Sequence, residues 1–398
     1  MRRSVVIAVW LALLLAPSLA RARGTVRYDV SYVWDQDFAK VMERKRVVGS
    51  ALGPRVAKRL RVMQLDEGFA LIYPRRAGLR DVQAAAAAHS RTLRRRSLGE
   101  AVVTESRRWT VVSDEGVRRV PSAEQVRLEE EADDAERVQL EKLVEDYVSE
   151  LRRSGGLTPD ERTAWSVHDF TTGEELVGIN ADLKLQAASL IKPFVALAYL
   201  HEVKEGRQVY DAQSRRRLER MIQHSDNGAT NWVMRRLGGP AAVQKLLQER
   251  YAGILEGIEL VEYIPPGGRT YRNKASARDY SRFLLALWRS ELPGSDEIKR
   301  LMALPKRDRL HTGVRLPEDT EVYSKTGSTS QLCGDMGMLL AKGPDGRQYA
   351  YTVIGIIEKK HAARHYARWL RARGDIIREM SGMVYQIIAG LHGFAAEP

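Results

Sequence analysis

The chain has 398 residues, which is long enough for two domains with hydrophobic cores of their own. Its single cysteine, Cys333, excludes an intramolecular disulfide, so the fold must rest on those cores. The net charge of +13 is uneven, because residues 23–120 carry 21 Lys and Arg against 11 Asp and Glu, whereas residues 121–398 are neutral. This asymmetry predicts an anionic partner for the N-terminal region.

Residues 1–22 have the pattern of a secretory signal peptide. A short basic start precedes an apolar run over residues 5–15, and small residues at Ala20 and Ala22 follow at cleavage spacing. The run is short for a membrane span, so we expect a secreted or periplasmic protein, monomeric and not transmembrane after cleavage; an uncleaved N-terminal anchor is the alternative. In that compartment, the anionic partner is an envelope polymer or a lipid headgroup rather than nucleic acid.

Residues 23–120 are predicted to form a small basic α+β domain. Alternating and helical periodicities follow one another in the order β-α-β-β-α-β, which is typical of a ferredoxin-like fold. The pattern is similar to that of the peptidoglycan-binding SPOR domains, although no motif supports this likeness. No catalytic constellation occurs here, and His89, which stands alone among Ala and Ser, is expected at the surface.

Residues 121–156 are predicted to form a charged linker helix. The segment opens with a capping pattern and carries most of its acids in its N-terminal half, where the helix dipole favours them. Apolar residues recur at helical spacing over residues 140–151. We expect this apolar stripe to pack on the second domain.

Residues 157–398 are predicted to form an αβα domain. The segment begins with a strand hairpin over residues 163–180, continues with helices, and ends with three strands and a long helix. We expect the strands from its two ends to pair into one antiparallel sheet with helices on both faces.

Three short motifs occur in this second domain. Ser189 and Lys192 form an S-x-x-K motif at the start of an apolar helix, where residues three apart share one face. By itself, this motif is more often a helix start with a buried lysine stem than a catalytic pair. Two further motifs favour the catalytic interpretation: Ser225-Asp226-Asn227 between two helices, and Lys325-Thr326-Gly327 at the end of a strand.

In this order, the motifs resemble those of the penicillin-recognising serine enzymes, and the chain is similar to class A β-lactamases. The stretch from His224 to Asn231, followed by Leu237-Gly238-Gly239-Pro240, continues the resemblance, which runs from about residue 160 to 392. It implies a β-lactamase/DD-peptidase-like fold, with an antiparallel sheet flanked by helices, and a serine hydrolase acting on amide bonds without a metal or cofactor. The first 120 residues lie outside this resemblance.

The resemblance implies catalytic roles in all three motifs. Ser189 is expected to be the nucleophile, with its backbone N–H as one oxyanion donor. Lys192, with a pKa lowered by partial desolvation, is expected to be the base or proton relay. Ser225 would relay a proton to the leaving amine, and Lys325 would raise the local positive potential and hold a substrate carboxylate.

The remaining motif residues are implied to bind substrate. Asn227 would bond the substrate amide carbonyl, Thr326 would add a hydroxyl donor, and Gly327 would let its strand approach the substrate closely. Thr329 or a neighbour would supply the second oxyanion N–H. Asp226 is expected to be structural and to bond its own loop.

The sequence departs from the class A pattern in two places. The E-x-x-L-N string that carries the water-activating Glu of class A enzymes is absent. Glu262 lies at about the right distance, 37 residues after Ser225, but Pro266 stands where the Asn is expected. Glu259 is a second option for the water-activating residue. Ser189 and Ser225 are only 36 residues apart, so one wall of the cleft is expected to be missing. A more open cleft suits a bulky or polymeric substrate.

Three functions remain open at this point. The first is β-lactam hydrolysis, in which Ser189 is acylated and water releases the product. The second is a D-Ala-D-Ala carboxypeptidase or another peptidoglycan-directed acyl hydrolase, which the open cleft, the absent string and the basic N-terminal region favour. The third, of another class, is a cell-wall binding or sensor protein without turnover, and the intact motif set argues against it.

Overall fold

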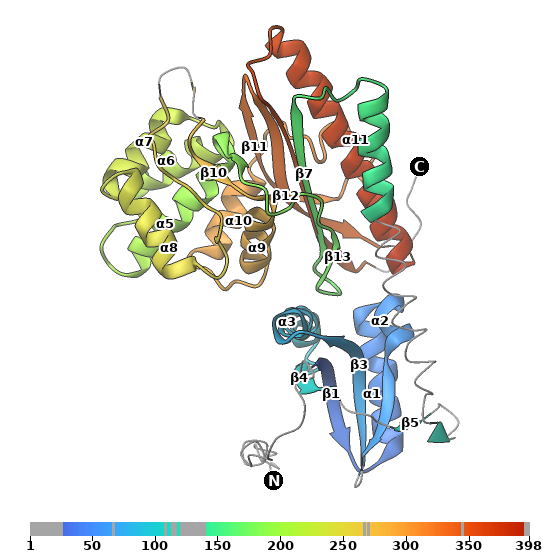
Figure 1. Cartoon of the computed structure of the whole chain (residues 1–398). Helices are drawn as coiled ribbons and strands as arrows, with labels where there is room; N and C mark the ends of the chain where they lie inside the picture. The colour runs from blue at the N-terminus through green and yellow to red at the C-terminus, as the bar shows by residue number, and fades with distance from the viewer. Residues whose placement is uncertain are drawn as a thin grey trace, which may run out of the picture.

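The protein consists of a smaller N-terminal domain and a larger C-terminal domain that meet at one end of each (Figure 1). A computed structural model describes residues 27–65, 68–106, 110–112, 118–119, 141–265, 268, 271–343 and 346–393. The predicted signal peptide and residues 121–140 of the predicted linker helix lie outside these ranges. In the part of the chain so described, no helix is both long and apolar enough to cross a lipid bilayer.

The N-terminal domain is built on one antiparallel sheet. Its elements are β1 (Tyr28–Asp35), α1 (Phe38–Leu52), α2 (Pro54–Arg59), β2 (Arg61–Leu65), β3 (Gly68–Ala77), α3 (Leu79–Arg95), β4 (Val102–Glu105), β5 (Thr110–Val112) and β6 (Arg118–Arg119). The sheet order is β4-β1-β3-β2-β5-β6, and every neighbouring pair is antiparallel. The order β4-β1-β3-β2 with two crossover helices is ferredoxin-like, so the β-α-β-β-α-β prediction is confirmed.

The prediction that His89 lies at the surface is wrong. Val82, Ala85 and Leu93 belong to the buried stripe of α3, and position 89 falls on that stripe at helical spacing. The imidazole is fully buried, with its Nδ1 2.6 Å from the hydroxyl of Tyr32, and burial lowers its pKa to about 3. His89 is therefore a neutral core residue.

The C-terminal domain contains the remaining elements. They are β7 (Glu161–Asp169), β8 (Glu174–Val177), β9 (Leu185–Gln186), η1 (Ala188–Ile191), α5 (Lys192–Lys204), α6 (Ala212–Gln223), α7 (Asn227–Arg236), α8 (Pro240–Tyr251), β10 (Lys274–Ala275), α9 (Ala277–Trp288), α10 (Ser295–Ala303), β11 (Glu321–Thr329), β12 (Leu332–Lys342), β13 (Gln348–Lys359) and α11 (Tyr366–His392).

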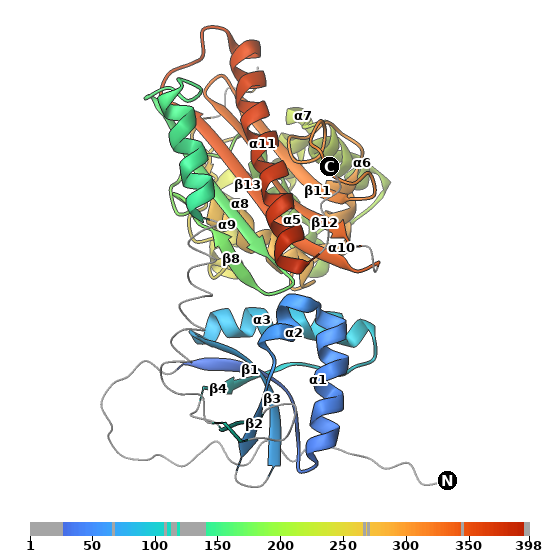
Figure 2. The same ribbon diagram turned by 90° about the vertical axis from the view of Figure 1, so that its right-hand side faces the viewer.

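The large sheet has the order β11-β12-β13-β7-β8, with all neighbours antiparallel. Strands from the two ends of the domain meet where β13 pairs with β7, as predicted. Helix α11 covers one face, while α9 and α10 pack on the other with α5 in the core behind them (Figure 2). Because both faces are covered, β12 and β13 are buried along nearly their whole length.

Part of the predicted linker helix is seen. Residues 141–153 are helical, and Val144 and Val148 are buried in the same apolar cluster as Trp369 and Ile377 of α11. The expected packing of this helix on the second domain is confirmed for these residues.

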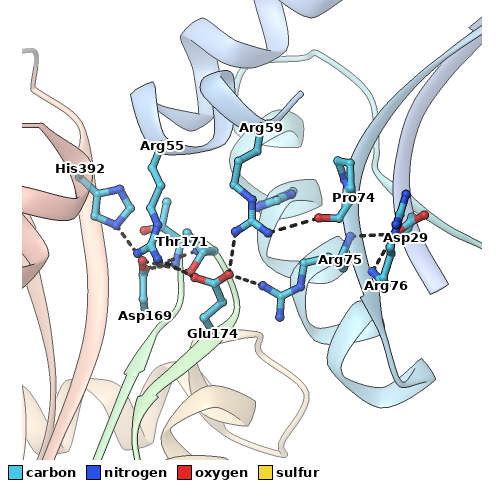
Figure 3. Close-up of polar contacts among 12 residues, drawn as sticks. Asp29, Arg55, Arg59, Pro74, Arg75, Arg76, Asp169, Thr171, Glu174 and His392 are labelled. Carbon is cyan, nitrogen blue, oxygen red and sulfur yellow. Dashed lines mark hydrogen bonds and ion pairs between the residues drawn. The ribbon is translucent and has the colours of Figure 1, made fainter. Parts of the chain in front are cut away.

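The turn between β7 and β8 joins the large domain to the small one. Glu174 forms ion pairs with three arginines of the small domain: Arg55 at 3.2 Å, Arg59 at 3.1 Å and Arg75 at 2.5 Å (Figure 3). Burial alone would raise the pKa of Glu174, but these three guanidinium groups outweigh it and hold the pKa below its usual range. The junction is therefore a buried, charge-paired contact.

One further contact joins the two domains, and another braces the large domain beside this junction. Gly173 has a φ of +75°, and a Cβ there would lie 2.8 Å from Cα of Ala85 in α3, so the turn approaches the helix as closely as only glycine allows. At the end of α11, Nε2 of His392 lies 2.8 Å from Oδ2 of Asp169, and both side chains are buried (Figure 3).

Candidate active site

Ser189 lies in the 3-10 turn η1, and the α-helix α5 begins at Lys192. Every residue of α5 from Lys192 to His201 is buried, which makes this helix a central element of its layer. Ala188 has a φ of +44°, a left-handed conformation that is uncommon for a residue other than glycine and that clusters at functional sites. Ser189 itself is only partly buried, so it is the accessible member of a buried segment.

The three motifs meet at the hydroxyl of Ser225. Its Oγ lies 2.8 Å from Oγ of Ser189, 3.1 Å from Nζ of Lys192 and 3.1 Å from Nζ of Lys325. The Lys192 nitrogen also contacts the backbone oxygen of Ser225 at 2.5 Å and Oδ1 of Asn227 at 2.9 Å. No contact described for Lys192 reaches the hydroxyl of Ser189 directly, so Ser225 links the two.

Lys192 donates three hydrogen bonds in this site. Its Nζ is the donor to the backbone oxygen and to Oγ of Ser225, and to Oδ1 of Asn227, so all three N–H groups of an ammonium have an acceptor. The hydroxyl of Ser225 in turn donates to Oγ of Ser189. Burial, to which the charge of Lys325 adds, lowers the pKa of Lys192 to about 6.

Lys325 is the second buried lysine of the site. Its Nζ donates to Ser225 and, at 2.9 Å, to the backbone oxygen of Thr326. Burial lowers the pKa of Lys325 to about 7, although the nearby Asp335 acts in the opposite direction. With pKa values of about 6 and about 7, Lys192 and Lys325 therefore lose their protons in neighbouring pH ranges.

We expect the rate of acylation at Ser189 to depend on pH as a bell with its maximum between about 6 and 7. The rising limb reflects loss of the proton from Lys192, because only the neutral amine accepts a proton. The falling limb reflects loss of the proton from Lys325, which removes the positive charge beside Ser225. The second-order rate constant for labelling by a fluorescent penicillin, measured across this range, checks both limbs.

The variant Lys325→Arg serves as the control for the falling limb. Arginine keeps its proton throughout, so this limb should move out of the measured range while the rising limb stays in place. A rising limb near the ordinary lysine pKa would contradict a neutral Lys192.

The Ser225 motif sits on a turn that starts α7. Ser225 has a φ of +55°, and Asp226 caps the helix by accepting the N–H of Ala229 at 2.7 Å. The second carboxylate oxygen of Asp226 pairs with Arg220. The structural role expected for Asp226 is therefore confirmed, and the cap holds Ser225 in its strained conformation.

Gly327 lets its strand pass close to the Ser189 turn, a contact that was not predicted. A Cβ on Gly327 would lie 2.7 Å from Cγ of Leu190 and 3.3 Å from the backbone oxygen of Ala187. The glycine thus allows β11 to approach the Ser189 turn itself. This approach brings Lys325 to Ser225.

The register of the β11–β12 hairpin favours Ser328 over Thr329 as an oxyanion donor. Thr329 pairs with Leu332 across a two-residue turn, and in such a hairpin the closing pair exchanges backbone hydrogen bonds. The N–H of Thr329 therefore points toward β12, while that of Ser328 points out from β11, the edge strand. The expectation named Thr329 or a neighbour, and this neighbour is Ser328.

Glu262 is bound to its own loop. Its Oε1 accepts the backbone N–H groups of residues 271 and 272, both at 3.1 Å. The contacts described for Ser189 and Lys192 do not include Glu262, and Glu259, the second option, forms a partly exposed ion pair with a lysine at 2.8 Å. This placement does not support the prediction that Glu262 activates the deacylating water.

Two asparagines that sequence reasoning missed hold this loop in place. The side chain of Asn231 bonds both backbone groups of Ile264, at 2.8 and 2.9 Å. The side chain of the buried Asn273 bonds both backbone groups of Glu262, at 3.0 and 3.1 Å. The backbone oxygen of Asn273 accepts the N–H of Ala187 at 2.8 Å, which ties the loop to the Ser189 turn.

Arg309 and Asp335 were also missed. Nη2 of Arg309 donates to Oγ of Ser328 at 2.8 Å, and Nη1 donates to the backbone oxygen of Gly334 at 3.0 Å, so the guanidinium braces the end of β11. Oδ2 of Asp335 accepts the backbone N–H of Arg309 at 2.7 Å, and burial raises the pKa of this carboxyl to about 6. An acid within the apolar run of β12 is the signal that could have pointed to this brace.

The sequence model of the beta-lactamase enzyme family matches residues 146–217 and 213–387, which is more than half of the chain. The chain belongs to the beta-lactamase enzyme family. The matched residues include all three motifs and leave out the N-terminal domain. No curated protein matches the chain.

Solved structures of similar fold cover somewhat more than half of the chain. A mutant class A β-lactamase of the last common ancestor of Gram-negative bacteria is 20% identical, with a TM-score of 0.50 over 62% of this chain and 98% of that one. A mutant of PBP-A, in an acyl-enzyme complex with penicillin G, is 23% identical, with a TM-score of 0.49 over 65% of this chain and 97% of that one. The larger domain thus has the fold of a β-lactamase-like serine hydrolase.

Proposed function

We propose that the protein is a serine acyl hydrolase, which is acylated at Ser189 by a β-lactam or a related amide and deacylated by water. The observation that carries this proposal is the hydrogen-bonded chain that joins the accessible Ser189 through Ser225 to the buried Lys192, whose pKa is lowered by burial. An exported protein, which the N-terminal sequence predicts, would meet such substrates in the cell envelope.

In the proposed acylation, Oγ of Ser189 attacks the carbonyl carbon. Its proton passes to Ser225 once Lys192 is neutral and the Ser225 hydroxyl, which donates to Ser189 in the structure, turns to give its own proton to Lys192. The backbone N–H groups of Ser189 and Ser328 hold the developing oxyanion. When the C–N bond breaks, Ser225 gives its proton to the leaving nitrogen and takes a proton back from Lys192. Lys192 is then neutral again, and the protons balance.

Two further residues orient the substrate in this proposal. Protonated Lys325 attracts a substrate carboxylate, as its position beside Ser225 and Thr326 allows. Oδ1 of Asn227 accepts an N–H of Lys192, so the amide N–H group of Asn227 is left to donate to the substrate's own amide carbonyl.

The placement of Glu262 favours a second candidate, a D-Ala-D-Ala carboxypeptidase or another peptidoglycan-directed acyl hydrolase. Fast release of a penicillin from Ser189 requires a base that activates water, and the carboxylate of Glu262 is occupied by N–H groups of its own loop. On this reading, the acyl-enzyme formed with a penicillin persists, while the natural peptide is released.

Labelling with a fluorescent penicillin, together with nitrocefin turnover, tests the proposal. We expect a covalent adduct on the full chain. Rapid hydrolysis of nitrocefin would support β-lactam hydrolysis, whereas a persistent adduct together with release of D-Ala from a stem pentapeptide would support the second candidate. If the protein formed no adduct and released no D-Ala, both would be refuted in favour of a cell-wall binding or sensor protein.

A further inference from the structure

The loop that leads from α8 to β10 is joined to the turn between β11 and β12. The hydroxyl of Tyr271 in this loop lies 3.0 Å from the hydroxyl of Ser330, which follows β11 directly. Both side chains are partly buried. The two residues are 59 positions apart in the chain, so this hydrogen bond links two separate walls of the candidate active site.

The same loop also touches the opposite side of the site. Gly268 has a φ of +70°, and a Cβ there would lie 3.3 Å from Nδ2 of Asn227 at the start of α7. This nitrogen is the one that remains for the substrate, because Oδ1 of Asn227 is bound to Lys192. The loop meets Asn227 at residue 268 and Ser330 at residue 271, so it lies across this end of the site.

The proposed acylation determines which part of a substrate meets this end. Lys325, which attracts the substrate carboxylate, lies in the middle of β11, and the oxyanion donor Ser328 lies further along the same strand. Ser330 comes after both, and a strand advances about 3.3 Å per residue. The carboxylate, the scissile carbonyl and the acyl side of the substrate therefore follow one another along β11. The acyl side points toward the contact between Tyr271 and Ser330.

The backbone at Tyr271 is held in place by Glu262. Oε1 of Glu262 accepts the backbone N–H groups of residues 271 and 272, both at 3.1 Å, and the buried Asn273 binds the backbone of Glu262. The backbone oxygen of Asn273 accepts the N–H of Ala187 at 2.8 Å, next to the Ser189 turn. Tyr271 therefore cannot move aside without loss of hydrogen bonds, each of which changes an equilibrium constant by about two- to tenfold.

We propose that Tyr271 is a specificity-determining residue that limits the acyl side of the substrate to a small substituent. A β-lactam or related amide with a small acyl group fits while Tyr271 stays bonded to Ser330, whereas a bulky acyl group has to break this bond first. The inference rests on the proposed acylation of Ser189. It adds a selection by acyl size that the three motifs do not make, since they bind the carboxylate and the scissile amide.

Two penicillins that differ only in the acyl substituent test this inference on the full chain. In 6-acetamidopenicillanic acid the substituent is a methyl group, and in nafcillin it is a substituted naphthalene. The second-order rate constant of adduct formation is measured for each by intact-mass spectrometry. The quantity of interest is the rate constant for the acetamido compound divided by that for nafcillin, which we call the acyl-size ratio.

The variants Tyr271→Phe and Ser330→Ala each remove one half of the same hydrogen bond, so each should lower the acyl-size ratio by about two- to tenfold. The two changes together should lower it no further than either change alone. Tyr271→Ala, which also removes the ring, should lower the ratio by about tenfold or more through faster reaction with nafcillin.

Tyr263→Ala is the matched control. It removes a tyrosine from the same loop, but the ring of Tyr263 is partly exposed and lies 6.0 Å from the guanidinium carbon of Arg235 on the outer side of α7. The acyl-size ratio of Tyr263→Ala should equal that of the unmodified chain.

Two outcomes would overturn the inference and leave the proposed function standing. One is an unchanged acyl-size ratio in Tyr271→Phe, Ser330→Ala and Tyr271→Ala. The other is an equal loss of rate with both penicillins, which would mean that Tyr271 only supports the fold of the site. If the unmodified chain formed no adduct with either penicillin, the proposed acylation would be refuted and the inference with it, so the acetamido compound separates the two failures.

Discussion

Replacing Ser189 by alanine is expected to abolish the covalent penicillin adduct. Ser189 is the partly exposed hydroxyl at the start of the path, whereas Lys192 and Lys325 are buried behind it. Without its Oγ no atom of the site can form the acyl bond, so the loss should be complete rather than partial. Intact-mass spectrometry after incubation with penicillin G, followed by peptide mapping of the unmodified chain, measures this.

The variant Ser225→Ala separates the nucleophile from the proton path. It keeps Ser189 but cuts its described link to Lys192, so the same adduct should form more slowly, by about 10²–10⁴-fold. An adduct on Ser189→Ala, or an unchanged rate in Ser225→Ala, would show that the path through Ser225 does not operate.

Replacing Glu174 by alanine should destabilise the protein by about 3–5 kcal/mol, because three buried arginines lose their common carboxylate. The ion pairs that are lost join the two domains, so we expect the domains to unfold separately, in two transitions instead of one. Calorimetry and urea unfolding followed by tryptophan fluorescence measure the two effects.

Glu43→Ala is the matched control for Glu174. Glu43 pairs with Arg46 on the exposed side of α1 at 2.7 Å, and such surface pairs add little to stability. Glu43→Ala should therefore unfold as the unmodified chain does. If Glu174→Ala lost no more stability than this control, the ion pairs of Figure 3 would not hold the domains together.

Much of the site was predictable, because its motifs are short and local. Ser189 with Lys192 is readable from spacing on a helix, and the order of the other two motifs indicated the family that the sequence comparison then showed. The burial of Lys192 followed from the apolar helix that it begins, whereas that of Lys325 was not predicted. What spacing could not indicate was the direct partner of each side chain, since Ser225 comes from a separate turn and reaches Ser189 only through the packing of α5 against α7.

The differences between these expectations and the structure share a physical cause. His89 was judged by its immediate neighbours, whereas its burial depends on which face of α3 meets the sheet. Glu262 was placed by distance along the chain, whereas its carboxylate is captured by backbone N–H groups of the loop it begins. Thr329 was chosen by counting from Gly327, whereas hydrogen-bond direction alternates along β11 and is set by the pairing with β12.

The sequence by itself determined the element order of both domains, the antiparallel pairing of strands from the two ends of the larger domain, and the candidate nucleophile with its two lysines. These depend on periodicity and on local motif chemistry, which each segment carries alone. Only the tertiary structure decided that Ser225 lies between Ser189 and Lys192, that Gly327 lets its strand approach the Ser189 turn, and that arginines of one domain meet Glu174 and Trp288 of the other. Such contacts join side chains far apart in the chain, so they follow from register and packing.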